Sequence, residues 1–378
     1  MKILLINSEF PPIGGGAGGA SANLARHLVL QGHDVLVLTS RFAALPHSET
    51  WQGVCVERVA SLRNYRDRSG LLEQVSFILV GGLTAGPLLK TFPADVSLAF
   101  FGVPSGPIAW LLRKRFGIPY LISMRGGDVP GFRPYDFGTY HRLVAPFLRL
   151  IWRNAGCLVA NSTGLRELAL NFEPSAHIEL VPNGVDLQTY VPLERPWSPP
   201  RLLSAGRFVY QKGFDLAAYA LAGLMDLDWE WNIAGDGNFR TEFERLCHQL
   251  GISERIHLLG WQSKEQLIQQ YIQANLFVFP SRHEGMPNAV LEAMASGLPV
   301  VASHIAGNEE LVIPSETGLL FPSESVPDLQ SVLRQMIPDA DRRQAMGIAA
   351  RARVETNYSW SRVAEQYTRL LVDMLEAG

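Results

Sequence analysis

Apolar residues follow two alternating patterns along this chain. Short apolar runs predict strands, and longer stretches with apolar residues every three or four positions predict helices. In the first half, the predicted strands are residues 2–7, 35–39, 54–59, 95–101, 120–123, 157–160 and 178–181. The pattern restarts with runs at residues 201–205, 229–234, 256–259, 276–280, 299–303 and 318–321. Helical stretches fill the intervals, for example at residues 19–30, 104–115 and 138–154. This alternation predicts an α/β fold with doubly wound parallel sheets.

A proline-rich stretch separates the two halves. Prolines stand at positions 192, 196, 199 and 200, and proline both removes a backbone donor and breaks helices. We therefore predict a linker over residues 187–200, between an N-terminal domain over residues 1–186 and a C-terminal domain over residues 201–357. A final segment, residues 358–378, completes the chain. Two α/β domains facing across a cleft are the expected architecture.

Composition excludes several classes of protein. The 378 residues suffice for two or three domains, and a hydrophobic content of 47% with 18% charge excludes wholesale disorder. The net charge of −3 argues against a protein that coats nucleic acid, so we expect no nucleic-acid partner. The 3 cysteines are too few for a disulfide framework, and a reduced, cytoplasmic location is expected.

The N-terminal half carries the features that bear on a membrane. The apolar stretch at residues 75–89 contains three glycines and a proline and falls short of the ~20 residues that span a bilayer. No signal peptide is expected. Basic residues cluster in this half at Arg58, Arg63, Arg66, Arg68 and residues 113–115. Two interpretations stay open: a solvated face, or a basic surface that makes peripheral contact with anionic lipid at the inner face of the cytoplasmic membrane or binds a phosphorylated acceptor.

A glycine-rich segment, residues 14–19, follows the first predicted strand. Glycine lets a backbone approach a ligand closely, and the amides at a helix N-terminus attract phosphate. The glycines match G-x-G-x-x-G but lie several residues beyond the strand, unlike a dinucleotide loop. Three interpretations remain: a nicotinamide or flavin site, a plain flexible loop, or a site for another phosphate-bearing ligand.

A second segment, residues 206–213, joins a predicted strand to a helix and carries Arg207 and Lys212. An arginine can clamp phosphate oxygens with two parallel N–H bonds, and a lysine adds a compact charge. The pair suits a diphosphate at the carboxyl edge of a sheet. Two ordinary surface cations are the alternative.

The segment 283–301 is the most informative. Pro287 and Gly297 bracket a predicted helix over residues 287–296, so Glu284 falls in the preceding loop and Glu292 within the helix. Eight helical residues span ~12 Å, beyond the ~5–9.5 Å of a hydrolase carboxylate pair. Separate binding tasks explain the spacing more simply. Glu292 stands among apolar residues and needs a partner, which either a ribose diol or a structural hydrogen bond would supply.

Taken in order, these motifs resemble the family 4 glycosyltransferases, retaining enzymes of the GT-B architecture with two Rossmann-like domains. The resemblance runs nearly from end to end, and it includes the paired glutamates together with Arg207 and Lys212. The matching segments are residues 11–17, 32–35, 181–186, 206–213, 235–237, 260–261 and 280–292.

The resemblance implies a role for each motif. Residues 1–186 would be the acceptor-side domain, residues 201–357 would bind the nucleotide-sugar donor, and the final helix would pack back on the N-terminal domain. Arg207, Lys212 and Glu284 would act in catalysis, as phosphate and sugar ligands. Glu292 would bind ribose. The other implied donor contacts are the backbone at Gly15, Gly16, Gln262, Gly285, Met286, Pro287 and Asn288.

One position departs from the family pattern. Arg125, in the loop 124–128, stands where the family usually has a histidine. Arginine cannot act as a base, but it can orient a donor hydroxyl or phosphate, so Arg125 is a catalytic candidate. Asp128 would pair with it or meet the acceptor.

The expected function is retaining transfer of a hexose from a nucleotide-diphosphate sugar. The donor is expected to be a UDP-sugar such as UDP-glucose, and the acceptor a carbohydrate or a lipid-linked glycan, in polysaccharide or glycoconjugate synthesis. The resemblance implies no resident cofactor and no essential metal, and the sequence agrees in that it shows no D-x-D placed as a metal site. Two alternatives are a catalytically silent protein that binds sugar nucleotides and an NAD(P)-dependent oxidoreductase.

Overall fold

The computed structural model describes residues 1–65, 69–132 and 134–377, with only the backbone described over residues 134–140. Contacts divide the chain into two compact units, which are described one at a time. Unit 1 comprises Met1–Asn183 and Trp360–Gly378, and unit 2 comprises Gly184–Ser359.

Unit 1 contains an eight-stranded sheet in the order β3-β4-β2-β1-β5-β6-β7-β8. Its neighbouring strands pair in parallel, except that β3 runs antiparallel to β4 at the edge. The strands are β1 (Lys2–Ile6), β2 (Asp34–Ser40), β3 (Ser48–Trp51), β4 (Val54–Val59), β5 (Val96–Phe100), β6 (Tyr120–Ser123), β7 (Cys157–Ala160) and β8 (Ile178–Leu180).

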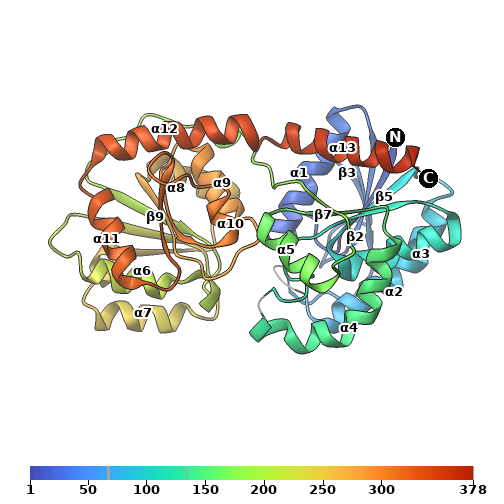
Figure 1. The fold of residues 1–378 in the computed structure, drawn as a ribbon, viewed down its shortest axis with the longest axis horizontal. Helices are drawn as coiled ribbons and strands as arrows, with labels where there is room; N and C mark the ends of the chain where they lie inside the picture. Colours follow the sequence, from blue (N-terminus) through green and yellow to red (C-terminus); the bar gives the residue numbers. More distant parts are fainter. Residues whose placement is uncertain (66–68, 133, 378) are drawn as a thin grey trace. The chain divides into compact units, whose positions relative to one another are not determined.

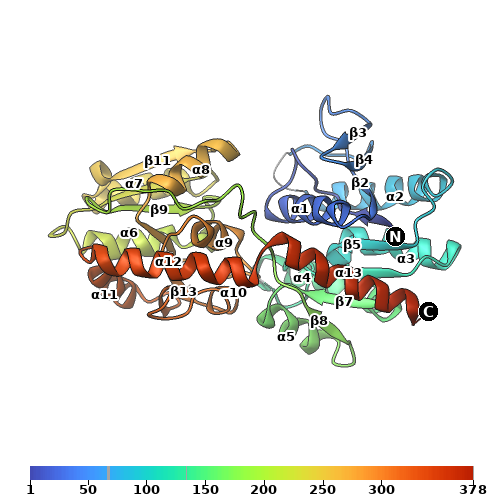
Figure 2. The same cartoon turned by 90° about the horizontal axis from the view of Figure 1, so that it is seen from above.

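Helices cover both faces of this sheet (Figures 1 and 2). They are α1 (Gly16–Leu30), α2 (Leu71–Leu88), the π-type turn η1 (Phe101–Ser105), α3 (Gly106–Phe116), α4 (Pro134–Asn154), α5 (Thr163–Phe172) and α13 (Trp360–Glu376). Successive strand residues point to opposite faces, so Leu5 joins a core with α1 and α13, whereas Leu4 joins a core with α2, α3, α4 and α5. The layer of α2 and α3 therefore lies on the opposite face from α1 and α13.

Unit 2 contains a six-stranded parallel sheet in the order β11-β10-β9-β12-β13-β14. Its strands are β9 (Arg201–Ala205), β10 (Glu230–Ala234), β11 (Ile256–Gly260), β12 (Leu276–Phe279), β13 (Val300–His304) and β14 (Gly318–Pro322). Leu202 faces a core with α6, α7 and α11, and Leu203 faces a core with α9 and α12. The helices are η2 (Tyr210–Lys212), α6 (Phe214–Ala222), α7 (Arg240–Gln249), η3 (Ser253–Arg255), α8 (Lys264–Gln273), α9 (Asn288–Ala295), α10 (Ala306–Glu309), α11 (Val326–Met336) and α12 (Ala340–Asn357).

The predicted fold class, α/β with two parallel sheets, is confirmed. Each predicted strand exists within two residues of its predicted ends. Strand β3 was not predicted, because its four residues, SETW, carry no apolar run and lie at the sheet edge. Helix α1 begins three residues before the predicted start, inside the glycine-rich segment.

Helix α2 covers most of the apolar stretch at residues 75–89 and begins four residues before it, at Leu71. The helix has 18 residues with a mean hydropathy of 1.4, and only 22% of it is buried. By length and composition alone it would suffice to cross a membrane. The prediction that this stretch is too short is therefore not supported by the length of the helix.

The 3 cysteines are free thiols.

Candidate functional site

The loop after β9 positions the two predicted phosphate ligands. Arg207 is exposed and forms no ion pair with the part of the chain that the structure describes. Lys212 ends the short turn η2, and Gly213 follows with φ +65°. A Cβ at Gly213 would lie 2.0 Å from the carbonyl oxygen of Pro280, so only glycine lets this loop pass so close to the end of β12.

A second loop, residues 280–287 after β12, lies directly against the first. Lys212 Nζ is 2.6 Å from Glu284 Oε1, and the same oxygen accepts a 2.6 Å hydrogen bond from Ser281 Oγ. Both side chains of the ion pair are largely buried, at 16% and 12% exposure. The structure therefore brings together two predicted ligands that stand 72 positions apart.

Arg282 fastens the two loops, and the sequence analysis missed it. Its guanidinium donates to both carboxylate oxygens of Asp215, at 3.0 and 2.7 Å, and to the carbonyl of Tyr210 at 2.6 Å. It also stacks 3.8 Å from the centre of the Tyr210 ring. The sequence held one signal for this role: Arg282 stands in the same loop as the predicted ligand Glu284. A buried arginine needs an acidic partner, and that partner is Asp215.

The amides predicted to cover the donor lie where this loop enters α9. Gly285, Met286 and Pro287 are buried, and Asn288 is half-buried as the first residue of the helix. Pro287 is the N-cap rather than the first helical residue that the sequence predicted. Gly307 of α10 permits this packing, because a Cβ there would lie 2.3 Å from the Gly285 carbonyl oxygen.

Glu292 lies on α9 and already has protein partners. Its Oε2 accepts a 3.0 Å hydrogen bond from the Tyr271 hydroxyl, and Tyr190 also donates to the carboxylate. Burial raises the pKa of Glu292 to about 7, an effect that these hydrogen bonds offset only in part. The structural hydrogen bond that the sequence left open for Glu292 is thus present.

Gln262, the predicted nucleobase contact, is half-buried just after β11. Its side-chain amide donates a 2.7 Å hydrogen bond to the Leu259 carbonyl. That bond ties the side chain to its own turn, and the turn presents the neighbouring Trp261 at 58% exposure.

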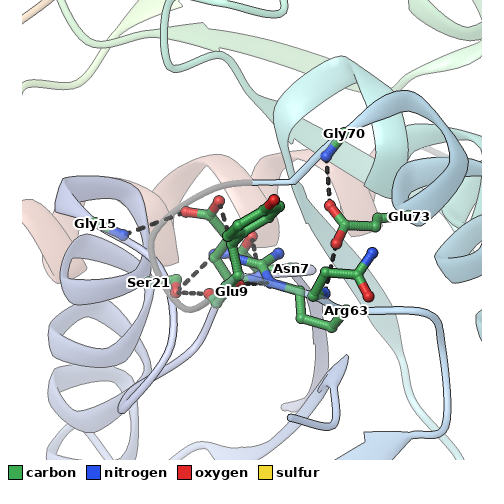
Figure 3. A network of polar contacts seen from close by, with 9 residues as sticks. Asn7, Glu9, Gly15, Ser21, Arg63, Gly70 and Glu73 are labelled. Atoms are coloured by element: carbon green, nitrogen blue, oxygen red, sulfur yellow. Dashed lines mark hydrogen bonds and ion pairs between the residues drawn. The ribbon is translucent and has the colours of Figure 1, made fainter. Parts of the chain in front are cut away.

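In unit 1, the carboxylate of Glu9 accepts a hydrogen bond from the backbone of the glycine-rich segment (Figure 3). Glu9 Oε2 accepts a 3.4 Å hydrogen bond from the Gly15 amide, and Glu9 Oε1 lies 3.6 Å from a terminal nitrogen of Arg63. Gly15 caps α1, whose first residue is Gly16. The predicted anion-binding amide is therefore directed at a side chain of the chain itself, and Glu9 is a second residue that the sequence analysis missed.

The predicted basic cluster divides into buried and exposed residues. The Arg58 side chain has 0% exposure and pairs with Glu49 at 2.6 Å, and the Arg63 side chain has 1% exposure. These two arginines are therefore not part of a basic surface, because their side chains are buried and each pairs with a glutamate, Arg58 with Glu49 and Arg63 with Glu9. Arg66 and Arg68 lie outside the described residues. Residues 113–115 are exposed at the end of α3.

The loop 124–128 holds Arg125 and Asp128 in a way the sequence did not predict. Asp128 accepts backbone N–H bonds from Gly102, Arg125 and Gly126, at 2.7, 3.0 and 3.1 Å. Burial raises its pKa, against the effect of these amides. No ion pair joins the two side chains within the described chain: of the roles left open for Asp128, side-chain pairing with Arg125 is not seen, and the carboxylate instead holds the loop backbone, including the Arg125 amide.

The guanidinium of Arg125 turns toward other partners in unit 1. It donates to the side chain of Asn183 at 2.5 Å and to the Tyr367 hydroxyl of α13 at 3.1 Å. It also lies 4.2 Å from the centre of the Phe100 ring. Arg125 therefore connects the loop 124–128, the end of β5 and the last helix.

A hollow of about 720 Å³ in unit 2 is lined by segment 192–197, Gly297 and residues of α12. None of the predicted site residues lines it. Among the described residues, no three His, Cys, Asp or Glu side chains are grouped so as to hold a metal ion.

Comparisons with known proteins give the family of the chain. Residues 15–184 match the model of the glycosyl transferase 4-like domain, and residues 192–353 match the model of glycosyl transferases group 1. Together the two matches span most of the chain. The chain belongs to the family 4 glycosyltransferases.

Relatives of this glycosyltransferase match it along nearly its whole length. A GDP-mannose-dependent alpha-(1-6)-phosphatidylinositol monomannoside mannosyltransferase from Mycobacterium tuberculosis is 25% identical, over 98% of both chains. The structure of sucrose-phosphate synthase from Thermosynechococcus elongatus has a TM-score of 0.87 at 23% identity, covering 100% of this chain and 99% of the other. The structure of HepE from Anabaena in complex with UDP and glucose has a TM-score of 0.78 at 19% identity, covering 98% and 99%.

The glycosyltransferase therefore has the GT-B architecture of its structural neighbours. Family membership removes the basis for the NAD(P)-dependent oxidoreductase, which rested on the glycine-rich segment alone. The nine residues between β1 and α1 agree, since a dinucleotide loop follows its strand at once.

Proposed function

We propose that this glycosyltransferase transfers a hexose from a UDP-sugar such as UDP-glucose, with retention of anomeric configuration. The acceptor is a carbohydrate or a lipid-linked glycan, in polysaccharide or glycoconjugate synthesis. The observation that carries the proposal is the contact of Lys212 with Glu284, made from the loop that also carries the exposed Arg207. Two cations on one loop, with a carboxylate in contact with one of them, match the diphosphate and the sugar hydroxyls of such a donor.

The reaction breaks the bond between the sugar and the diphosphate, so negative charge grows on the leaving phosphate. Arg207 and Lys212 stabilise that charge, and they do so more strongly than in water because Lys212 is largely buried. The Arg282 contacts hold both loops before the donor arrives, which lowers the cost of ordering them.

Glu284 binds the sugar. Its Oε1 takes the hydrogen bonds from Lys212 and Ser281, and within the described residues Oε2 accepts none. Oε2 is therefore available for a sugar hydroxyl. Gly285, Met286, Pro287 and Asn288 follow it into α9, where backbone amides at a helix start favour the neighbouring phosphate.

Glu292 and Gln262 bind the nucleoside part of the donor. Glu292 accepts hydrogen bonds from the ribose hydroxyls, and the Tyr271 hydroxyl holds its carboxylate in place. The backbone at Gln262 contacts the nucleobase. Gly15 and Gly16 bring their backbone close to the donor from unit 1, with the Gly15 amide exchanging Glu9 for the donor, and Arg125 orients a donor hydroxyl or phosphate. Asp128 supports the loop that carries Arg125, and no metal or resident cofactor is required.

The choice of UDP is supported by the HepE structures, whose ligands are UDP, glucose and UDP-glucose. A relative that uses GDP-mannose makes the guanine donor the strongest competitor, and its phosphatidylinositol monomannoside acceptor supports a lipid-linked one here.

A thermal-shift screen with UDP, GDP, ADP and their sugar conjugates tests the donor. A ligand that binds the folded state raises the unfolding midpoint, so UDP and UDP-glucose should give the largest shifts. A larger shift with GDP-mannose would replace UDP by GDP. NMR spectroscopy of the first product formed from the α-linked donor tests the mechanism, and a β-linked product would exclude retention.

A further inference from the structure

The outer side of α2 carries an exposed apolar stripe. Leu72, Val75, Leu79 and Leu83 are 77, 43, 63 and 78% exposed, and their spacing of three or four residues places them on one side of the helix. We call these four residues the α2 stripe. A run of large exposed side chains on one helix marks an interaction surface rather than ordinary scattered exposure.

The opposite side of α2 belongs to the core of unit 1. Phe77 and Ala85 are 1 and 0% exposed and pack on the sheet. The only charged residue of the helix, Glu73, is also turned inward, where it accepts hydrogen bonds from the amides of Gly70 and Asn64. Helix α2 is thus apolar on both sides, yet it cannot leave unit 1 to span a bilayer without exposing the core.

Three cations lie on the last turn of α3, which neighbours one end of α2. Helix α3 packs along α2, because a Cβ at Gly82 would lie 3.4 Å from Leu111 and one at Gly86 would lie 3.2 Å from the ring of Phe116. The last turn of α3 therefore adjoins the end of α2 that follows Leu83. That turn carries Arg113, Lys114 and Arg115, all exposed and none in an ion pair with a described residue.

We propose that the α2 stripe and residues 113–115 form a surface that binds an anionic lipid bilayer, with α2 lying in the plane of the interface. An apolar side inserts among the acyl chains, and adjacent cations bind anionic headgroups; the surface offers both. This combination of charge and apolar area selects a lipid surface over a second copy of the chain, which would have to bury three cations. The proposal goes beyond the proposed function and does not depend on it.

Flotation with vesicles tests the proposal without donor or acceptor. The purified full chain is mixed with vesicles of phosphatidylcholine alone, or of phosphatidylcholine with about 30% phosphatidylglycerol. The first variant, Leu72→Gln/Leu79→Gln/Leu83→Gln, removes the apolar side chains. The second, Arg113→Gln/Lys114→Gln/Arg115→Gln, removes the charges and keeps the stripe. Thermal unfolding confirms that each variant is folded.

Control variants with two substitutions each place the same kinds of change elsewhere on the surface. Leu30→Gln/Ile348→Gln changes two apolar residues that are 69 and 66% exposed on α1 and α12. Arg245→Gln/Arg369→Gln removes two exposed cations on α7 and α13. Neither control pair lies on α2 or α3.

The parent chain should float with the anionic vesicles, and about 0.5 M salt should weaken the binding by screening. Each triple variant should bind at least about tenfold more weakly, and both controls should bind like the parent. Equal binding by parent and triple variants would overturn the proposal, as would a parent that does not float. A parent dimer that the leucine variant converts to monomer, without vesicle binding, would assign the stripe to a second copy instead.

Discussion

Lys212 and Glu284 are joined by a 2.6 Å ion pair although 72 positions separate them in the chain. In the proposed donor site one binds phosphate and the other binds sugar, so each holds the other in place before either meets the donor. Because both are largely buried, an uncompensated charge at either position would be costly, and the pairing balances the two charges.

Arg207 provides the first prediction. Replacing it by alanine should remove a charge-assisted contact worth ~1.5–3 kcal/mol and weaken UDP binding ~10- to 150-fold. Its exposure and lack of ion pairs among the described residues mean that the fold should be unaffected. Isothermal titration calorimetry measures the change, with Arg245→Ala on α7 as a matched exposed control. Equal UDP affinity in Arg207→Ala and Arg245→Ala would remove Arg207 from the donor site.

Glu284→Gln separates sugar binding from nucleotide binding. The amide keeps the shape but loses the ion pair, which leaves Lys212 free to meet phosphate. Transfer should fall by at least about tenfold, while UDP affinity should stay the same or rise slightly. Steady-state kinetics and calorimetry on one preparation decide this. A parallel loss of UDP affinity and of transfer would contradict the assignment to the sugar.

Glu292 makes stability depend on pH. Its folded pKa of about 7 lies above the ordinary 4.5, so the folded state favours the protonated carboxyl. Between pH 4.5 and about 7 the unfolded chain has lost this proton while the folded chain still holds it, so the free energy of unfolding falls as pH rises through this range. Above about pH 7 the folded group is ionised too, and the decline stops. The total decline is about 3 kcal/mol. Urea unfolding should show this decline in the parent and not in Glu292→Gln.

The same variant tests ribose binding. The parent should bind UDP more tightly than the analogue lacking both ribose hydroxyls, and Glu292→Gln should lose most of that preference. If the variant kept the full preference while its pH dependence disappeared, Glu292 would serve only the hydrogen bonds with Tyr271 and Tyr190.

Arg125 can be tested against a structural role. Arg125→Ala should leave UDP affinity nearly intact and lower the transfer rate at least ~10-fold. It should also lower the free energy of unfolding by about 1–3 kcal/mol, because the bonds to Asn183 and Tyr367 are lost. Tyr367→Phe is the control, since it removes one of these bonds and keeps the guanidinium. Transfer at the parent rate by both destabilised variants would make Arg125 purely structural.

Local pattern predicted most of the fold. The apolar runs located the strands because buried parallel strands carry near-continuous apolar sequences, and β3 escaped because an edge strand does not. The glycines near Lys212 and Glu284 likewise mark loops in the sequence itself.

Partners across the chain could not be read from sequence. The Arg282–Asp215 pair joins residues 67 positions apart, and although Arg282 stands next to a predicted ligand, the sequence does not show which acidic residue it pairs with. Arg58 and Arg63 suggested a basic surface, yet their acidic partners Glu49 and Glu9 come from other segments and neutralise them inside unit 1. Charge along a chain predicts a surface only when the partners of each charge are known.

Release of UDP from UDP-glucose in the presence of a carbohydrate acceptor pool tests the central claim most directly. The parent should release UDP in step with formation of a glucosylated product, and Glu284→Gln should do so at least about tenfold more slowly. A parent chain that binds UDP but turns over no UDP-, GDP- or ADP-sugar would contradict the account, and it would identify a catalytically silent sugar-nucleotide-binding protein.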